Sequence, residues 1–396
     1  MSLSSDTIVG VIGAGAMGSG IAQVAAAAGH RVVLADARTG ATEAARANLG
    51  LTLEKLVEKG KLDRNDADRL IGRVDYQWEP LGTDFSAYAR CGLVIEAIVE
   101  DLDAKQDLLR RLEAVVARDT VLATNTSSLP VASLASACAV PERVVGLHFF
   151  NPAPILPLVE VVPWLGGDPI VASSSYALMR EWKKTPVLAS DSPGFIVNRV
   201  ARPFYGEAIR LLEEGVADIA TIDWAMTEYG KFRMGPFELM DFIGNDVNFA
   251  VTRSVFTSMF YDPRYKPSLT QARMVDAGFL GRKTGRGYYD YRAGAVRPAA
   301  KKDPAVGLLI FERILAMLIN EAVDAVLMRV ASPEDIDLAM TKGVNYPKGL
   351  LAWANEIGPA RVLGWLERLQ QEYGEDRYRA SPLLRRMVRD EQRFFA

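Results

Sequence analysis

The stretch TIVGVIGAGAMGSGIAQVAAAAGHRVVLAD, residues 7–36, alternates strand and helix signals around a run of glycines. It opens on a short apolar run rich in β-branched residues at 8–12, which is typical of a strand buried on both faces of a parallel sheet. Three glycines with the spacing G-x-G-x-x-G follow, then a helical pattern and a second strand at 31–35. This order of elements predicts a βαβ unit that binds a dinucleotide.

Each residue of the glycine turn has its own physical reason. Gly13 permits the tight turn, Gly15 lets backbone N–H groups approach a pyrophosphate, and Gly18 lets the helix pack closely on the strand. Ala16 and Met17 complete the turn at the helix N-terminus, whose partial positive charge attracts phosphate. We expect these five residues to contact the cofactor, against the alternative of a glycine-rich turn that is purely structural.

Asp36 ends the second strand of this unit, 18 residues beyond Gly18. A carboxylate at this place accepts hydrogen bonds from the adenosine ribose and repels a 2′-phosphate, so it predicts NAD as the cofactor. Arg38 keeps NADP open as the less favoured interpretation.

The composition excludes several classes of partner. A net charge of −3 over 396 residues gives no broad basic field, so we expect neither nucleic acid nor a membrane surface as a partner. No apolar run reaches the roughly 20 residues of a membrane span, and the first residues, MSLSSD, predict no leader, so we expect a cytoplasmic protein. Cys91 and Cys138 are isolated and predict buried free thiols, and two histidines without clustered thiols predict no metal site.

The pattern along the chain predicts an α/β Rossmann domain with a doubly wound sheet, followed by two tandem all-α domains. We place their bounds at 1–190, 191–295 and 305–396. The expected strands are 8–12, 32–35, 93–96, 121–124, 144–147 and 158–162. Residues 42–70 form a charged helical excursion with Leu49, Leu53, Leu56 and Val57 on one face.

The helical part contains an internal repeat. Residues 195–244, the first copy, align without a gap on residues 309–358, the second copy, at an offset of 114 and with fourteen identities. The matches include Arg199 with Arg313, Glu207 with Glu321, and Ile243-Gly244 with Ile357-Gly358. We expect the copies to pack on each other as an intramolecular pseudo-dimer, joined by a polar linker near 291–304.

Polar residues follow two of the expected strands, at the sheet edge where ligands bind in such folds. Asn125 and Ser127 come after one strand, and His148 comes after the next. A histidine beside a nicotinamide can take the proton of a substrate hydroxyl while hydride leaves the same carbon. A histidine at a strand end is also commonly structural, so the sequence alone leaves both readings open.

Glu160 favours the catalytic reading, because it alternates with Leu158 and Val162 on an apolar face and a buried carboxylate needs a partner. An imidazole N–H of His148 suits it, and the carboxylate would stabilise the imidazolium that forms. The alternative is a structural ion pair with Arg199 or another cation. Ser127 and Asn198 are neutral groups able to bind a substrate oxygen, although each residue type also favours caps and loops.

Together these segments resemble the 3-hydroxyacyl-CoA dehydrogenase family over nearly the whole chain. The motifs that carry the resemblance are GAGAMGSGIA, VIEAIVEDL, ATNTSSLP, GLHFFNPAP with LVEVV, DSPGFIVNR, MGPFELMDFIG and GRKTGRGYYDY. The resemblance implies NAD-dependent oxidation of an L-3-hydroxyacyl-CoA to the 3-oxoacyl-CoA.

Carried over by motif, the resemblance implies a role for each of the site residues. His148 is then the general base and Glu160 its orienting partner, while Ser127 and Asn198 contact the substrate oxygen. The residues implied as NAD contacts are Asp36, Glu100, Lys105, Asn125 or Ser127, and Lys283. Thr52 and Lys59 fall where the helical excursion of the family meets coenzyme A.

The tandem second copy resembles longer bacterial members, in which the extra helical domain takes the place of a partner subunit. Within that branch, IGNDVNFAVTRSVF and GVNYPKGLLAW look most similar to 3-hydroxyadipyl-CoA dehydrogenases of phenylacetate breakdown. One departure is Leu156-Pro157, where family members usually carry Met-Lys.

The resemblance leaves the acyl chain open. The first reading is a 3-hydroxyadipyl-CoA substrate, with Arg202 and Arg253 as candidate anchors for its distal carboxylate. The second is a short-chain 3-hydroxybutyryl-CoA dehydrogenase, and a third, of another class, is a catalytically silent NAD-binding protein like a lens crystallin. A monomer is expected if the second copy already fills the dimer contact, with a homodimer as the alternative.

Overall fold

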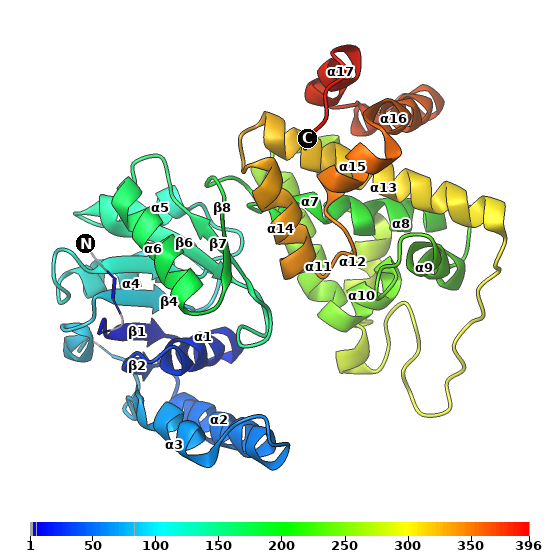
Figure 1. The fold of residues 1–396 in the computed structure, drawn as a ribbon. Coiled ribbons are helices and arrows are strands. Elements are labelled where there is room, and N and C mark those ends of the chain that lie inside the picture. The colour runs from blue at the N-terminus through cyan, green and yellow to red at the C-terminus, as the bar shows by residue number, and fades with distance from the viewer. Residues whose placement is uncertain (1–2, 5, 83, 396) are drawn as a thin grey trace. The chain divides into compact units, whose positions relative to one another are not determined.

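The computed structural model describes residues 3–4, 6–82 and 84–395. The chain forms two compact units, the first ending at Ser192 and the second beginning at Pro193. Figure 1 shows the strands confined to the first unit and helices making up the second.

The first unit is built on one sheet with the strand order β3-β2-β1-β4-β5-β6-β7-β8. Its strands are β1 (Val9–Ile12), β2 (Val32–Ala35), β3 (Val74–Tyr76), β4 (Leu93–Glu96), β5 (Val121–Thr124), β6 (Val144–Phe149), β7 (Leu158–Val162) and β8 (Thr185–Leu188). Neighbouring strands are parallel except β6 and β7, which are antiparallel. The α/β fold class predicted from the sequence is confirmed.

Two of these strands were not predicted, and both lie at an edge of the sheet. β3 has only three residues, with the exposed Asp75 in the middle. β8 contains Pro186, which cannot donate a backbone hydrogen bond and is tolerated at an edge. Neither has the apolar run that marks a central strand.

The helices of the first unit pack on this sheet (Figure 1). They are α1 (Ala16–Ala27), α2 (Ala41–Glu58), α3 (Arg64–Gly72), α4 (Leu102–Glu113), α5 (Val131–Ala135) and α6 (Pro169–Glu181), with short 3-10 turns η1 (Ser86–Tyr88) and η2 (Pro141–Arg143). In α2, Leu49 and Leu53 are buried and Leu56 and Val57 are half-buried, which is the apolar face that the sequence predicted. The rest of α2 is largely exposed, so this helix stands out from the sheet as an excursion.

The second unit is helical over the residues that the structure describes. Its elements are α7 (Val197–Val200), α8 (Arg202–Glu213), α9 (Ile219–Glu228), α10 (Pro236–Ile243), α11 (Asn245–Ser258), η3 (Pro263–Tyr265), α12 (Leu269–Asp276), η4 (Arg282–Thr284), α13 (Pro304–Leu327), α14 (Pro333–Gly343), α15 (Leu350–Ile357), α16 (Pro359–Tyr373), η5 (Asp376–Tyr378) and α17 (Pro382–Arg389). The polar linker predicted near 291–304 is an irregular segment that ends where Asp303 caps α13.

The repeat in the sequence is a repeat in three dimensions. α10 and α15 start 114 positions apart, and so do α11 and α16, so the register extends beyond the aligned residues. In the first copy the carboxylate of Asp223 accepts hydrogen bonds from the first N–H groups of α10. Asp337, its counterpart, does the same for α15. Each copy therefore fixes the N-terminus of the equivalent helix, α10 or α15, with an aspartate at the same position of the repeat.

Ion pairs between the two copies repeat with their roles exchanged. Arg199 Nε donates to Glu321 Oε1 at 2.6 Å, and the equivalent Arg313 Nε donates to Glu207 Oε2 at 3.0 Å. All four residues are buried. Self-complementary pairing of this kind is the signature of a two-fold interface. Arg199, named in the sequence analysis as an alternative partner of Glu160, forms its buried salt bridge with Glu321.

Two smaller features concern the chemistry of the chain. Cys91 and Cys138 are free and buried, as predicted. Within the described ranges, no helix has both the length and the apolar character needed to cross a membrane.

Candidate active site

His148 and Glu160 face each other across the antiparallel pair of strands. They are direct partners in the register of β6 and β7, and His148 Nδ1 lies 2.6 Å from Glu160 Oε2. His148 was expected just after its strand, but it lies inside β6, because pairing with β7 extends the strand to Phe149. The alternation around Glu160 thus located the partner of the histidine correctly.

Burial and hydrogen bonding define the state of this pair. His148 is 6% exposed and Glu160 is fully buried. An ionised carboxylate only accepts hydrogen bonds, so Nδ1 carries the imidazole proton and Nε2 is the basic nitrogen. The ring of Phe150 lies 4.5 Å from the imidazole centroid and limits its rotation. The arrangement suits a general base whose positive charge, once it forms, is stabilised by the carboxylate.

Asn125 ties the neighbouring strand end to this pair. Its side-chain Oδ1 accepts a hydrogen bond from the backbone N–H of Phe149 at 2.9 Å, and its own N–H donates to the carbonyl of Glu96. Through its side chain and its backbone, Asn125 therefore links the ends of β4, β5 and β6. This is the edge at which parallel strands carry ligand-binding residues.

Glu100 organises the loop that carries Ser127. One of its carboxylate oxygens, Oε1, accepts from the Thr126 hydroxyl at 2.7 Å and from the N–H groups of Ser127 and Ser128 at 2.9 and 3.1 Å. Burial alone would raise the pKa of Glu100, but the charge of Lys105 and these hydrogen bonds hold it below its usual range. Glu100 is therefore an anion that fixes the backbone on both sides of the Ser127 side chain.

Behind Glu100 lies a buried ion pair that the sequence-based analysis missed in part. Lys105, which was predicted, is buried against Glu96, which was not, and also lies 3.2 Å from Glu100. Glu96 is the last residue of β4, and burial raises its pKa although the Lys105 charge opposes the shift. A carboxylate that ends an otherwise apolar strand was the signal that could have identified it.

The glycine turn has the shape that a dinucleotide requires. Gly13 has a left-handed φ of 103°, and a Cβ on Gly18 would lie 1.7 Å from the Gly13 carbonyl oxygen. A Cβ on Gly15, in contrast, would meet nothing closer than the Arg38 guanidinium at 4.0 Å. Only Gly15 therefore leaves room for a phosphate, while the other two glycines are required by the fold.

Asp36 is oriented toward this turn. Its carboxylate accepts from the Ala14 N–H at 2.7 Å and pairs with Arg38 at 2.9 Å. Burial alone would raise the pKa of Asp36, but the hydrogen bonds from Arg38 and Ala14 hold it below its usual range. Arg38, the residue that favoured NADP as the alternative cofactor, forms its ion pair with Asp36. The negative charge of Asp36 suits a ribose hydroxyl rather than a 2′-phosphate.

A cavity of about 840 Å³ opens beside the glycine turn. Its walls are the turn itself, the facing sides of α1 and α2, and the loop after β6 at Pro152, Pro154 and Ile155. Thr52 lines this cavity from α2. Lys59 is not one of the lining residues; it is exposed at the C-terminal end of the same helix.

The loop after β6 is held by a lysine that was not predicted. Lys184 Nζ donates to the backbone carbonyls of Ala153 and Leu156, the latter at 2.9 Å. Desolvation lowers the pKa of this half-buried ammonium group. Pro157, the departure from the family pattern, accepts from the Thr185 N–H at 2.8 Å, so the loop that joins the strands of His148 and Glu160 is tied down at three carbonyls.

The remaining candidates belong to the second unit. Asn198 lies in α7, and its backbone carbonyl accepts from Arg202 Nε at 2.7 Å. Lys283 lies in η4 and forms an ion pair with Asp246 at 2.6 Å. Arg202 is buried in α8, whereas Arg253 is exposed on α11.

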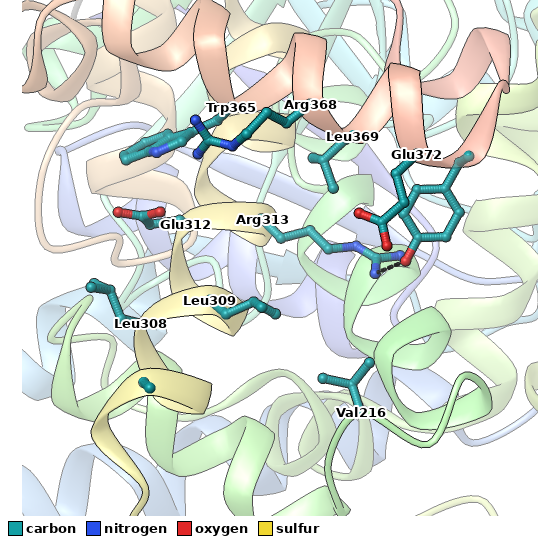
Figure 2. Close-up of a pocket in the computed structure, with 11 residues that line it drawn as sticks. Val216, Leu308, Leu309, Glu312, Arg313, Trp365, Arg368, Leu369 and Glu372 are labelled. Atoms are coloured by element: carbon teal, nitrogen blue, oxygen red, sulfur yellow. Dashed lines mark hydrogen bonds between the residues drawn. The ribbon is translucent and has the colours of Figure 1, made fainter.

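Figure 2 shows a second cavity, of about 500 Å³, within this helical unit. It lies between α13 and α16, with Leu309 and Leu369 among its apolar walls and the pair Arg313 and Tyr373 joined by a hydrogen bond. None of the candidate site residues lines it.

Comparison with known proteins gives a consistent result over both units. The model for the NAD-binding domain of 3-hydroxyacyl-CoA dehydrogenases matches residues 8–192, and the model for their C-terminal domain matches twice, at 194–291 and 309–393. The chain is 40% identical to a 3-hydroxyadipyl-CoA dehydrogenase of Escherichia coli K12, covering 95% of this chain and 96% of that protein.

Two further relatives carry a different name. A 3-hydroxybutyryl-CoA dehydrogenase of Clostridioides difficile is 40% identical and covers 71% of this chain and 98% of its own length. A crystal structure titled 3-hydroxybutyryl-CoA dehydrogenase from Escherichia coli K12 superposes with a TM-score of 0.92 at 38% identity, covering 98% of this chain and 99% of that one.

Proposed function

Because the chain belongs to the 3-hydroxyacyl-CoA dehydrogenase family, we propose that it oxidises 3-hydroxyadipyl-CoA, a thioester whose acyl chain ends in a second carboxylate. The reaction class is that of the family: NAD-dependent oxidation of a 3-hydroxyacyl-CoA to the 3-oxoacyl-CoA. The dicarboxylic substrate is supported by the relative of that name, which matches this chain over nearly the full length of both. The shorter 3-hydroxybutyryl-CoA is the second candidate, supported by the crystal structure that bears that title.

The buried contact of 2.6 Å between His148 and Glu160 is the observation that carries the catalytic assignment. His148 Nε2 takes the proton of the 3-hydroxyl group, and Glu160 stabilises the imidazolium through Nδ1. In the reverse direction the same nitrogen returns the proton to the 3-oxo group. Ser127, and Asn198 from the helical unit, donate hydrogen bonds to the substrate oxygen and stabilise the charge that develops on it.

NAD, when bound, accepts the hydride that leaves the hydroxyl carbon. Within the turn of Gly13, Gly15, Ala16, Met17 and Gly18, backbone N–H groups hold its pyrophosphate. Asp36 binds the adenosine ribose, and Glu100, Lys105, Asn125 and Lys283 complete the cofactor site. Thr52, with Lys59 further along α2, binds the coenzyme A portion of the substrate beside the cavity of about 840 Å³.

We further propose that the two helical copies act as one intramolecular pseudo-dimer. The exchanged ion pairs of Arg199 and Arg313 bury the surface that a separate partner subunit would otherwise cover. A monomer is the state this arrangement favours. The two buried free thiols suit a reducing compartment, so we place the enzyme in the cytoplasm.

Replacing His148 by Gln tests the catalytic assignment. The variant keeps a neutral polar side chain but removes the base, so kcat for acetoacetyl-CoA reduction is expected to fall by about 1,000-fold. The dissociation constant of NADH, measured by fluorescence, is expected to change less than about threefold, because the glycine turn is untouched. Glu160→Gln should lower kcat as well, since the imidazolium loses its counter-charge; near-wild-type turnover of the His148 variant would refute the assignment.

A further inference from the structure

Arg202 is a buried cation without an acidic partner. It lies at the start of α8 and is 7% exposed. Among the residues that the structure describes, no carboxylate lies within ion-pair distance of its guanidinium. Burial lowers the pKa of Arg202, and the neighbouring Tyr205 and Tyr346 only partly oppose this shift. An uncompensated buried charge of this kind is costly to the fold.

The contacts of this guanidinium are all to neutral groups. Nε donates to the Asn198 carbonyl at 2.7 Å, and Nη1 donates to the Thr252 hydroxyl at 3.2 Å. One face of the group stacks on the Tyr205 ring at 4.9 Å. In the described part of the chain, no atom accepts a hydrogen bond from Nη2. The group therefore keeps both its charge and one of its donor nitrogens available to an anion.

Two more polar groups near Arg202 are buried with their hydrogen-bonding capacity unused. The side-chain amide nitrogen of Asn248 and the hydroxyl of Tyr346 find no hydrogen-bond partner in the described residues, and these side chains are 3% and 5% exposed. Arg202 Nη1 donates to the backbone carbonyl of Asn248 at 3.5 Å, and the Tyr346 ring packs 5.8 Å from the ring of Phe204, two residues beyond Arg202. Buried hydrogen-bond donors are nearly always paired in proteins, so two donors without acceptors indicate a site where a ligand can supply the acceptor.

The repeat shows that the fold itself does not require these polar groups. At the offset of 114, Arg202, Asn248 and Thr252 correspond to Ala316, Val362 and Leu366 in the second copy, all fully buried. Tyr346 corresponds to Phe232, which lacks the hydroxyl, and the two rings touch at 5.0 Å. The second copy packs an ordinary apolar core where the first carries a cation and two polar side chains. Asn248 Oδ1 and the Thr252 hydroxyl accept hydrogen bonds from the buried Gln271 amide, but this leaves the charge of Arg202 and the amide nitrogen of Asn248 without a structural use.

We propose that Arg202, Asn248 and Tyr346 form the subsite that binds the distal carboxylate of a dicarboxylyl-CoA substrate, with Arg202 determining specificity for that class. A carboxylate supplies the missing charge to the guanidinium and the missing acceptor to the amide and the hydroxyl. The inference rests on the proposed function, in which Asn198 contacts the 3-hydroxyl oxygen.

The proximity of Asn198 and Arg202 agrees with the size of such a substrate. Asn198 lies in α7 and Arg202 begins α8, and Arg202 Nε donates to the Asn198 backbone carbonyl at 2.7 Å, so the two residues are direct neighbours and a short acyl segment can reach from one to the other. In a 3-hydroxyadipyl group, three carbon–carbon bonds separate the hydroxyl carbon from the distal carboxyl carbon, a span of about 4 Å. Because Tyr346 belongs to the second copy, the subsite is complete only in a chain that carries both copies.

Arg202→Met tests the proposal by comparing two substrates. We expect kcat/KM for 3-hydroxyadipyl-CoA to fall by about 100-fold, as for other losses of a charge-assisted contact. For 3-hydroxybutyryl-CoA, which has no distal carboxylate, it should stay within about threefold. Equal losses for both substrates would show that Arg202 only supports Asn198, and would overturn the proposal.

Further variants distinguish the loss of a carboxylate subsite from a general loss of folding. Tyr346→Phe removes one hydroxyl. It should lower kcat/KM for 3-hydroxyadipyl-CoA by about tenfold and leave kcat/KM for 3-hydroxybutyryl-CoA unchanged. The quadruple variant Arg202→Ala, Asn248→Val, Thr252→Leu, Gln271→Leu replaces these polar groups by apolar ones, and it includes Gln271 because the buried amide of that residue would otherwise lose its acceptors on Asn248 and Thr252. It should fold and lose the preference for the dicarboxylyl substrate. Arg368→Met, an exposed arginine labelled in Figure 2, is the matched control and should leave the substrate ratio unchanged.

A binding measurement separates this inference from the proposed function. Free adipate should raise the melting temperature of the wild type but not that of Arg202→Met, and butyrate should raise neither. Lack of wild-type turnover of both thioesters would count against the proposed function alone. An adipate effect that survives in Arg202→Met, or a substrate ratio that follows Arg253→Met instead, would overturn the assignment to Arg202.

Discussion

Asp36 illustrates how the neighbours of a single side chain fix its protonation state. The hydrogen bonds from Ala14 and Arg38 outweigh the effect of burial and keep the pKa of this carboxyl below its usual range. A lowered pKa means that the ionised form, with the hydrogen bonds it accepts, is present above the ordinary carboxyl pKa and is lost only as the pH falls through the lowered value. The ribose-binding charge is thus constant over the physiological range.

We expect the affinity for NADH to be flat from about pH 8 down to about pH 5, because Asp36 stays ionised throughout this range. Fluorescence titration at several pH values measures it. In Asp36→Asn the charge is absent at every pH, so affinity for NADH should drop by about tenfold while discrimination against NADPH weakens. A wild-type affinity that declines steadily below neutral pH would contradict the assigned ionisation state.

At the scale of elements, the β1 and α1 pair shows that glycines in one motif do different work. The crowded contact at Gly18 lets helix and strand approach, whereas the open space at Gly15 faces a ligand. A second example at this scale is the antiparallel pairing of β6 with β7, which places His148 opposite Glu160 although they are not neighbours in sequence.

Two alanine substitutions are expected to separate these roles. Gly18→Ala places a methyl group 1.7 Å from the Gly13 carbonyl, so α1 must move off the sheet and the first unit should lose its cooperative thermal transition. Gly15→Ala meets no atom of the chain within van der Waals contact, so its melting temperature should match the wild type while the NADH dissociation constant rises about tenfold or more. Equal melting temperatures for the two variants would contradict this division.

At a larger scale, two equivalent ion pairs join the two copies of the repeat within the helical unit. The buried pairs of Arg199 with Glu321 and of Arg313 with Glu207 run between the copies in opposite directions. A buried pair stabilises little by itself, but removing one member leaves an uncompensated charge. The pairs therefore specify how the two copies meet more than they add to overall stability.

Removing one partner should cost far more than removing both. Glu321→Gln leaves the buried Arg199 without its counter-charge, so the free energy of unfolding is expected to fall by about 3–5 kcal/mol. Arg199→Met combined with Glu321→Gln removes both charges and keeps an acceptor for the buried Tyr265 hydroxyl, so it should recover most of this loss, as measured by urea unfolding of the full chain. A double variant less stable than Glu321→Gln would mean that the pair contributes through its own attraction instead.

The amino-acid sequence by itself determined the fold class, the repeat, and the identity of His148 and Glu160 as a pair. These depend on local signals: apolar runs, alternation with period two, glycine spacing and an offset of 114 between identical residues. The edge strands β3 and β8 carry such signals too weakly, because one is three residues long and the other contains a proline.

Only the tertiary structure decided which groups share an environment. Lys184 contacts the loop after β6, Glu96 pairs with Lys105, and Arg202, which has no acidic partner among the described residues, lies near Asn248 and Tyr346. The apolar strand before Glu96 is a local signal of its burial, but the partners of all three residues are neighbours distant in sequence, which only the fold brings together. The sequence therefore predicted the pairing of His148 with Glu160, whereas the packing of the helical unit is what brings Asn248 and Tyr346 to the surroundings of Arg202.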